Sequence, residues 1–394
     1  MTDPLLTLFI EELIADLIRF THLRDGHRSD EIHIRRESQI GPLSFADLEV
    51  HIPNTDVHYY VEVDHGYSDL RIINSLKRKY SSELPAKMLV LALPSASAEL
   101  VQKVTDALHT DMSIEIWDTD TVLRRIYDFF SIKVTELSIK NLDRLRTAIA
   151  KKKWDYAFAG LFANHKLRRR LLWHYGFWQL KNFHDHYGAT PDDILVETTY
   201  SQAVVLMSDL CSFSSYVRDT SNERTARLAL TGFYSKARYA VINNGGMLYQ
   251  FVGDEVIGVF GIPFASSGDP VNAIQCANEV SSIGDSVSAD WQRSIDRVQS
   301  SQGTHTGIGI GSLTLLGLRP YSPGDFGVFG DTINMSARLC TAADSGDIVI
   351  SNTVRNKLPA NHQKHCEKLE PLEAKNMGRI FAWRYNGHRA DEST

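Results

Sequence analysis

Several features are scarce in this chain of 394 residues, and each absence narrows the class of protein. Four cysteines without CxxC spacing argue against a disulfide framework or a zinc knuckle and favour a reducing compartment. No apolar run approaches the roughly 18 residues that span a bilayer. Acidic residues among the first twenty argue against a secretory or transit peptide. We therefore expect a cytoplasmic protein without stable membrane association.

The chain also lacks a strong excess of charge of one sign. Its net charge of -6 is mild, so the protein as a whole is not built to coat nucleic acid or anionic lipid. The 43% hydrophobic and 23% charged residues are ordinary for a folded protein, and 25 glycines are too few for a collagen-like chain. The length suggests two or three domains.

Residues 1–130 predict an α/β module. Apolar residues at helical spacing open it, and strand-like runs follow around 31–36, 46–52 and 58–64. A helix over 68–80, a buried strand and a further helix–strand pair complete the pattern.

This α-β-β-β-α-β order resembles a restriction-endonuclease-like core. Asp47 and Glu62 stand where that family carries metal-binding carboxylates, but the position of its lysine holds Asp64. Replacing a lysine by a carboxylate should cripple phosphodiester cleavage, so we expect a sensor or regulatory module. Lys77 or Lys79 could substitute from the following helix, which keeps a nuclease as the alternative.

Residues 131–195 predict a basic helical linker. Lysines and arginines far outnumber acidic residues between 136 and 184, and aromatic side chains are interleaved with them. A pair of amphipathic helices with their cations in water explains this pattern, and a nucleic-acid or partner surface is the alternative. A third segment over 196–387 and a tail over 388–394 complete the expected organisation.

The third segment alternates strands and helices in a β-α-β-β-α-β order, which predicts an α+β sandwich of the ferredoxin-like kind. Asp209 follows an apolar strand, where it is exposed at the edge of the sheet. Gly253-Asp254 separates two strands and predicts a hairpin tip. Asn334 and Arg338 are four residues apart on a predicted helix and project from one face.

In this order and spacing, the three pieces resemble class III nucleotidyl cyclases. The resemblance implies that a 3′-oxygen of ribose attacks the α-phosphorus of a nucleoside triphosphate, with pyrophosphate leaving. It implies two Mg²⁺ or Mn²⁺ ions per site, held by Asp209, Asp254 and the Leu210 carbonyl. Carboxylate oxygens suit these hard cations, which take their remaining ligands from phosphate and water.

The resemblance also assigns roles to residues around the triphosphate. Asn334 orients the ribose, and Arg338 neutralises charge that grows on the α-phosphate. The loop amides after Asp209 hold phosphate oxygens, with Phe213 in this loop a substrate-binding candidate. Lys375 in Leu372-Glu373-Ala374-Lys375 matches the triphosphate-binding lysine of the family, although Asn376 replaces the usual glycine.

In this family the metal-binding aspartates and the Asn/Arg pair come from opposite subunits. One chain carries one copy of each half, so the resemblance implies a homodimer with composite active sites.

Two positions that read the base in purine cyclases depart from the family pattern. Gln250 stands where adenylate cyclases carry lysine and guanylate cyclases carry glutamate, and Gly327 replaces the second base-reading side chain. An amide both donates and accepts, so Gln250 can pair with a uracil or cytosine edge. Tyr234 and Arg238 are further pocket candidates.

The pyrimidine cyclases of bacterial Pycsar anti-phage systems are similar in keeping the catalytic set while departing at these positions. This resemblance implies that the chain converts UTP, in preference to CTP, into a cyclic messenger that acts on a separate effector. An adenylate cyclase with a divergent base pocket is one alternative. A nucleic-acid-binding or nuclease protein that uses the cyclase fold as a dimer scaffold is another.

Overall fold

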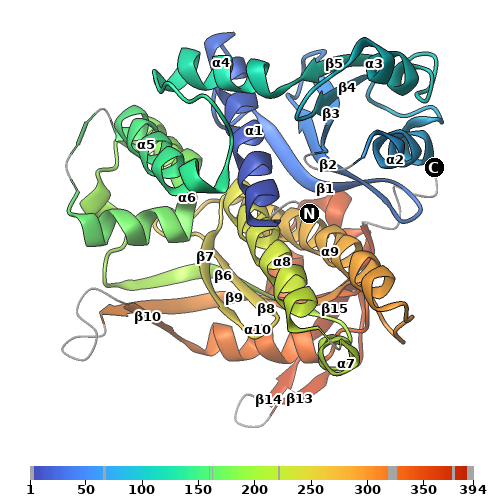
Figure 1. Cartoon of the computed structure of the whole chain (residues 1–394). Coiled ribbons are helices and arrows are strands. Elements are labelled where there is room, and N and C mark those ends of the chain that lie inside the picture. The colour runs from blue at the N-terminus through green and yellow to red at the C-terminus, as the bar shows by residue number, and fades with distance from the viewer. Residues whose placement is uncertain are drawn as a thin grey trace. The chain divides into compact units, whose positions relative to one another are not determined.

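The computed structural model describes residues 4–64, 68–158, 160–161, 163–220, 222–317, 326–374 and 378–387. The chain divides into two compact units, Met1–Gly160 and Leu161–Thr394, each described below by itself (Figure 1). The division falls inside the segment 131–195 that the sequence predicts as a linker. The predicted tail, 388–394, lies outside the described residues.

The first unit is an α/β module that follows the predicted element order up to the strand at 113–117, after which two helices follow. Its elements are α1 (Pro4–Arg24), β1 (His33–Gly41), β2 (Ser44–His51), β3 (His58–Val63), α2 (Asp69–Tyr80), β4 (Met88–Ala92), α3 (Ala98–Thr105), β5 (Ser113–Trp117), α4 (Thr119–Phe130) and α5 (Ile139–Phe158). The sheet order is β1-β2-β3-β4-β5, antiparallel up to β3 and parallel from β3 to β5.

The sheet lies between two layers of helices, with one apolar core on each of its faces. One core joins α1, α4 and α5 to one face, and the other joins α2 and α3 to the opposite face. Lys153 of α5 is buried and pairs with Asp16 of α1 at 2.6 Å, so this lysine of the basic segment does not face water. The helix α5 therefore belongs to the first unit.

The second unit contains the predicted catalytic domain and one further long helix. Its elements are α6 (His165–Tyr187), η1 (Pro191–Asp193), β6 (Thr199–Leu210), α7 (Phe213–Asp219), α8 (Glu223–Asn243), β7 (Met247–Val252), β8 (Glu255–Phe260), α9 (Asp269–Ile295), β9 (Thr304–Gly317), β10 (Phe326–Phe329), α10 (Asp331–Thr341), β11 (Ile348–Ser351), α11 (Asn352–Lys357), α12 (Ala360–Gln363), β12 (Cys366–Lys368), β13 (Leu372–Ala374), β14 (Gly378–Ile380) and β15 (Ala382–Tyr385).

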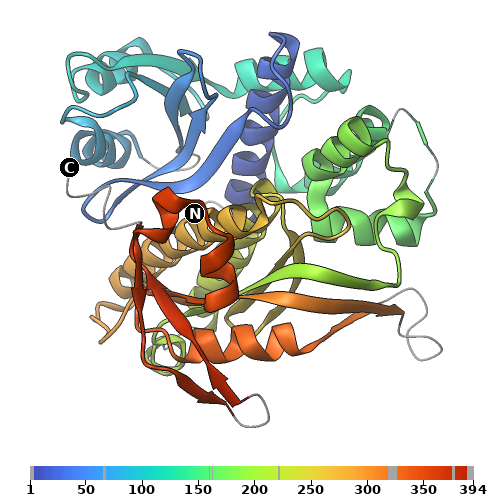
Figure 2. The same cartoon turned by 180° about the vertical axis from the view of Figure 1, so that it is seen from behind.

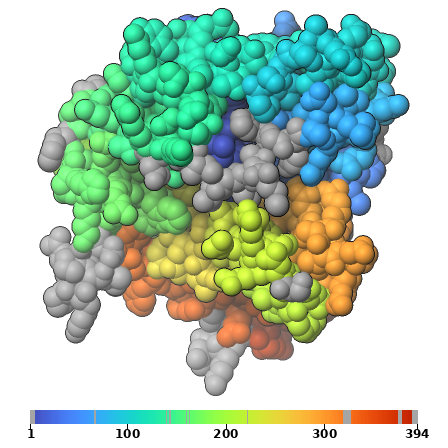
Figure 3. Space-filling model, in the orientation of Figure 1, coloured from blue at the N-terminus to red at the C-terminus, as the bar shows by residue number. Residues whose placement is uncertain are grey.

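The sheet order β12-β15-β11-β9-β6-β8-β7 contains a ferredoxin-like kernel. Its four strands β9-β6-β8-β7 are antiparallel, and the chain visits them as β6, the β7–β8 hairpin and then β9. The helices α8 and α9 cover one face and α10 covers the other (Figures 1 and 2). Parts of α8 and α9 are visible at the surface in this view of the molecule (Figure 3). This topology confirms the predicted mixed α+β fold of the segment.

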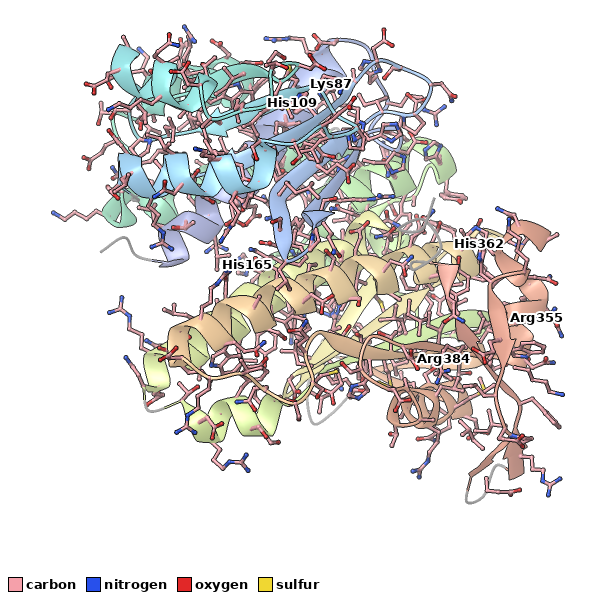
Figure 4. The ribbon with its side chains drawn as sticks, turned by 90° about the vertical axis from the view of Figure 1, so that its right-hand side faces the viewer. Lys87, His109, His165, Arg355, His362 and Arg384 are labelled. Atoms are coloured by element: carbon pink, nitrogen blue, oxygen red, sulfur yellow. The ribbon has the colours of Figure 1, made fainter. Side chains whose placement is uncertain are left out.

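Polar and aromatic contacts around β15 stabilise the edge of this sheet that contains β12, β15 and β11. Arg384 donates to Asp347 at 2.6 Å, and the Arg355 guanidinium lies 4.7 Å from the centre of the Trp383 ring. The ring of His362 bonds the Tyr385 hydroxyl at 2.8 Å. Arg384, Arg355 and His362 come from one strand and two short helices and gather at this end (Figure 4).

A row of glycines lets α10 approach the sheet closely. Gly307, Gly309 and Gly311 alternate along β9 with isoleucines that belong to the opposite core. A Cβ atom at Gly307 would lie 2.2 Å from the Cys340 backbone nitrogen. At the other two positions it would lie 2.7 and 2.6 Å from hydroxyls of α10. The absence of side chains on this face therefore sets the position of α10.

The mutation Gly307→Ala should lower the free energy of unfolding by about 2–4 kcal/mol, because backbone atoms of α10 block the new methyl group. Gly232→Ala is the matched control, since a Cβ there meets nothing within 4 Å and the residue is helical. The control should leave stability unchanged or raise it by up to about 1 kcal/mol. Chemical denaturation followed by circular dichroism measures both. Equal stability of Gly307→Ala and wild type would contradict this account.

Candidate functional site

Two carboxylates meet where a strand end and a hairpin tip lie side by side. Asp209 is the penultimate residue of β6, and Asp254 lies in the two-residue turn between β7 and β8. Since β6 and β8 are antiparallel and Ser208 pairs with Val256, the end of β6 reaches the start of β8. The carboxyl groups of Asp209 and Asp254 lie within hydrogen-bonding reach. The structure therefore brings together the two predicted metal ligands.

The electrostatics of this pair favour a cation. Burial, followed by the hydrogen bond and the charge of Asp209, raises the pKa of Asp254 from 3.8 to about 7. Burial and the charge of Asp209 also raise the pKa of Glu255. Two neighbouring carboxylates repel each other when both are ionised, and a divalent cation bound between them would relieve the repulsion.

The chemistry of the pair fits Mg²⁺ or Mn²⁺, which prefer carboxylate oxygens. Within the described ranges, no group of three or more His, Cys, Asp or Glu side chains could hold a metal ion by itself. Ions bound here must therefore take further ligands from backbone oxygens, such as the Leu210 carbonyl, from water or from a substrate.

The turn that carries Asp254 is held from α8. Gly253 has a φ of +63°, a left-handed conformation that glycine adopts without strain. The Tyr234 hydroxyl donates to the Gly253 carbonyl, and the Tyr234 ring lies 4.5 Å from the ring of Phe251. Tyr234, which the sequence predicts in the base pocket, thus contacts the hairpin tip next to Asp254.

Sequence reasoning missed His305, which lies opposite Asp209 in the β6–β9 register. Its Nε2 is 3.7 Å from Asp209 Oδ2, and its Nδ1 is 3.5 Å from the Cys211 sulfur. No local pattern around His305 points to this contact, because the pairing of two strands distant in sequence creates it.

Phe213 begins α7, and its side chain packs against the core of the second unit. Its ring lies 6.2 Å from that of Trp291 in an edge-to-face arrangement. The packing engages the side chain of Phe213, and a phosphate contact through its backbone amide stays a prediction. Lys375 lies outside the described residues.

Asn334 and Arg338 lie on the exposed face of α10, as their spacing predicts. The opposite face is fixed by two hydroxyls, with Ser336 donating to the Val205 carbonyl and Thr332 to the Ser312 carbonyl, both at 2.9 Å. In the described part of the chain, no hydrogen bond or ion pair joins Asn334 or Arg338 to the carboxylate pair.

The two predicted base-reading positions lie on segments that touch. Gln250 is exposed on β7, and Gly327 lies on β10. The Val328 backbone N–H donates to the Tyr249 hydroxyl at 3.2 Å, which links the immediate neighbours of both positions.

Arg238, a further predicted pocket residue, hydrogen-bonds to backbone carbonyls next to a break in a helix. The helix α6 is interrupted at Gly176, where φ is +66° and ψ is 179°. The break removes helical donors for carbonyls in the preceding turn. The Arg238 guanidinium donates to the carbonyls of Leu172 and Trp173, the latter at 3.0 Å. Its position therefore has a structural explanation.

The first unit places the nuclease-like residues in one buried cluster. The Lys79 amine lies 2.8 and 3.0 Å from the carboxylate oxygens of Glu62, so a helix supplies the cation that the strand position lacks. Burial, followed by the charge of Asp47, raises the pKa of Glu62 to about 8 and that of Asp64 to about 6. The role of this unit stays a prediction.

The comparisons with known proteins concern about half of the chain. No family model matches it. Over 202 residues it is 24% identical to the receptor-type guanylate cyclase gcy-8 of Caenorhabditis elegans, a match that covers 50% of this chain and 16% of that protein. The chain thus spans far less than two thirds of the curated relative it matches.

Solved structures of cyclases overlap the same share of the chain. The guanylyl cyclase Cya2 is 19% identical, with a TM-score of 0.43, over 49% of this chain and 95% of that one. The adenylyl cyclase CyaB from P. aeruginosa is 19% identical, with a TM-score of 0.42, over 48% and 95%. Among the described residues, no helix is long and apolar enough to cross a membrane.

The mutation Asp254→Asn should stabilise the metal-free protein at pH 8, because it removes the repulsion by Asp209. The pKa of Asp254 is raised on folding, so the cost to the folded state is absent below about pH 4, grows between pH 4 and 7 and is full above pH 7. We expect a gain of about 1 kcal/mol, since the group is only half-buried.

Thermal unfolding in EDTA at pH 8 and pH 4 measures this effect. The variant should gain at pH 8 and match wild type at pH 4, and Mn²⁺ at pH 8 should stabilise the wild type more than the variant. A variant that is less stable than wild type at pH 8 in EDTA would contradict the account.

Proposed function

We propose that the second unit is a class III nucleotidyl cyclase that converts a nucleoside triphosphate into a 3′,5′-cyclic nucleotide and pyrophosphate. The observation that carries this proposal is the Asp209–Asp254 pair at the junction of β6 and the β7–β8 turn. Asn334 and Arg338 on an exposed helix face and the similarity to a guanylate cyclase over half of the chain support it.

Each side chain has a role that its chemistry suits. Divalent cations at the carboxylate pair would supply charge stabilisation to the attacking oxygen and to the phosphates. Arg338 would donate to the non-bridging oxygens of the α-phosphate as negative charge grows there, a contribution on the order of 10²–10³ in rate. Asn334 would hold the ribose so that its 3′-hydroxyl points at the α-phosphorus.

The active site is proposed to form between two copies of the chain. The α10 pair is exposed, and within the described residues it makes no bond to the carboxylate pair. A two-fold dimer would bring the pair of one copy to the carboxylates of the other and create two equivalent sites.

The substrate is proposed to be a pyrimidine nucleotide, UTP in preference to CTP. Gln250 presents an amide, which can donate and accept at once, and Gly327 leaves the second base-reading position without a side chain. We extend the proposal, on resemblance alone, to a messenger role in anti-phage defence with a separate effector. An adenylate cyclase with a relaxed base pocket is the alternative.

Mixing two inactive variants tests the composite site. Asp254→Ala and Arg338→Ala should each lower cyclase activity by about 10²-fold or more. Random exchange of subunits gives heterodimers with one intact site, so an equimolar mixture should recover about a quarter of wild-type activity. Light scattering checks that both variants remain dimeric. Failure of the mixture to exceed either variant, with subunit exchange verified, would contradict the composite site.

Exchanging the base-reading side chain tests the pocket. Gln250→Lys introduces the residue of class III adenylate cyclases and should raise kcat/KM for ATP relative to UTP by about tenfold or more. Gln250→Leu is the control, because it removes the amide without adding a donor and should lose UTP turnover without gaining ATP turnover. An unchanged base preference in both variants would refute the assignment of Gln250.

A further inference from the structure

The first half of α6 packs against the strands that carry both base-reading positions. It comes after the division of the chain at Gly160 and lies within the second unit. The turn before the break at Gly176 contributes Arg170 and His174. The sequence predicts this segment as part of the basic linker, with a nucleic-acid or partner surface as the alternative, and connects neither residue with the base pocket.

His174 holds the backbone of β7. Its Nδ1 lies 2.6 Å from the Leu248 carbonyl oxygen, which can only accept, so Nδ1 carries the proton and donates. The side chain is 9% exposed. Burial, together with the charges of Arg170 and Arg238, lowers the pKa of His174 to about 4 although the Leu248 bond opposes the shift, so the ring is neutral at pH 7. The contact is a fixed hydrogen bond between neutral groups.

The bond falls at an irregularity of β7. Leu248 pairs with Gly258 and Gln250 pairs with Ile257, so Tyr249 is an extra residue between two regular pairs. A bulge of this kind changes the direction in which the following side chain points. The bond from His174 to the Leu248 carbonyl therefore holds the last regularly paired residue before the bulge. Gln250, the next paired residue after the bulge, is exposed.

The same histidine also contacts the second base-reading strand. The centres of the His174 and Phe326 rings are 4.7 Å apart, and Phe326 directly precedes Gly327. The Arg170 guanidinium lies 5.1 Å from the centre of the Phe326 ring. The Tyr249 hydroxyl completes the connection through its bond to the Val328 N–H.

The two parts of α6, before and after the break at Gly176, are held by different side-chain bonds. Arg238 of α8 binds the carbonyls of Leu172 and Trp173. Beyond the break, Gln179 donates to the Gly245 carbonyl at 3.1 Å. The bonds from Arg238 hold the turn that carries His174, whereas the bond from Gln179 holds the part of α6 beyond the break.

We propose that His174 is a positioning residue for base specificity, which holds the β7 bulge and the start of β10 so that Gln250 and Gly327 face the nucleobase of the substrate. The inference rests on the proposed function and adds α6 to the base pocket. This role differs from a general contribution to stability, because loss of the His174–Leu248 hydrogen bond should change the preference among bases.

Three variants separate these roles in the full-length protein. His174→Leu removes the donor, whereas His174→Asn places an amide N–H close to the position of Nδ1 and should restore the bond. Gln179→Leu is the matched control, since it removes one side-chain bond from the same helix to another backbone carbonyl. Steady-state kinetics with UTP, CTP, ATP and GTP give kcat and KM for each variant.

We expect His174→Leu to lower the ratio of kcat/KM for the preferred pyrimidine over ATP by about tenfold, mainly through KM. His174→Asn and Gln179→Leu should keep the wild-type ratio. An unchanged ratio in a folded His174→Leu variant, or an equal change in Gln179→Leu, would overturn the inference. If His174→Leu does not fold, Tyr249→Phe removes the acceptor for Val328 and should lower the same ratio.

Competition among the four nucleotides for a fluorescent nucleotide probe gives a second measurement that does not require cyclisation. A wild type that discriminates bases in binding but makes no cyclic product would refute the proposed function while the His174 variants still test the inference. A wild type that cyclises with the same base ratio as His174→Leu would refute only the inference. A wild type that neither binds nor cyclises nucleotides would refute both.

Discussion

The proposed active site depends on holding two negative charges together without their cations. Asp209 and Asp254 lie within hydrogen-bonding reach, and the pKa of Asp254 rises to about 7 as a result of burial and of this neighbour. Such a pair persists only when the backbone on both sides is fixed. The antiparallel pairing of β6 with β8 fixes one side, and the bond from Tyr234 to the Gly253 carbonyl fixes the other. The raised pKa of Asp254 means that ionising this pair costs stability in the folded protein, and the divalent cations proposed for this site would offset that cost.

Other parts of the proposed site are also positioned by backbone contacts that glycines allow. Glycines on one face of β9 bring α10 against the sheet, and this sets where Asn334 and Arg338 stand. The break at Gly176 exposes carbonyls that Arg238 binds, and the turn before it supplies His174 to β7. In each case a glycine lets two backbone segments come close or lets a helix break, and a side chain from another element then hydrogen-bonds to the backbone there. The residues proposed to touch the substrate are few, and their placement depends on these supports.

Much of the fold could be predicted from the sequence, because local signals encode the elements. The proximity of Asp209 and Asp254 agrees with the resemblance to class III cyclases, and their role as metal ligands stays a prediction. Apolar periodicity gave the order of strands and helices, and Gly253-Asp254 marked a hairpin tip. The contacts of His305 and His174 could not be predicted, since they arise from strand register and from packing between distant segments. The sequence predicts Tyr234 and Arg238 in the base pocket, and in the structure their polar groups bind backbone carbonyls at Gly253 and in α6. Their roles in base recognition stay predictions.

One measurement tests the central claim most directly: incubation of the purified full-length protein with equal UTP, CTP, ATP and GTP and either Mn²⁺ or Mg²⁺, with the products separated by mass. The account predicts cyclic UMP, or failing that cyclic CMP, together with pyrophosphate, and loss of product in the Asp209→Ala variant. Cyclic AMP as the main product would retain the cyclase and discard the pyrimidine assignment. The absence of any cyclic nucleotide with either metal, or a product that survives Asp209→Ala, would contradict the account.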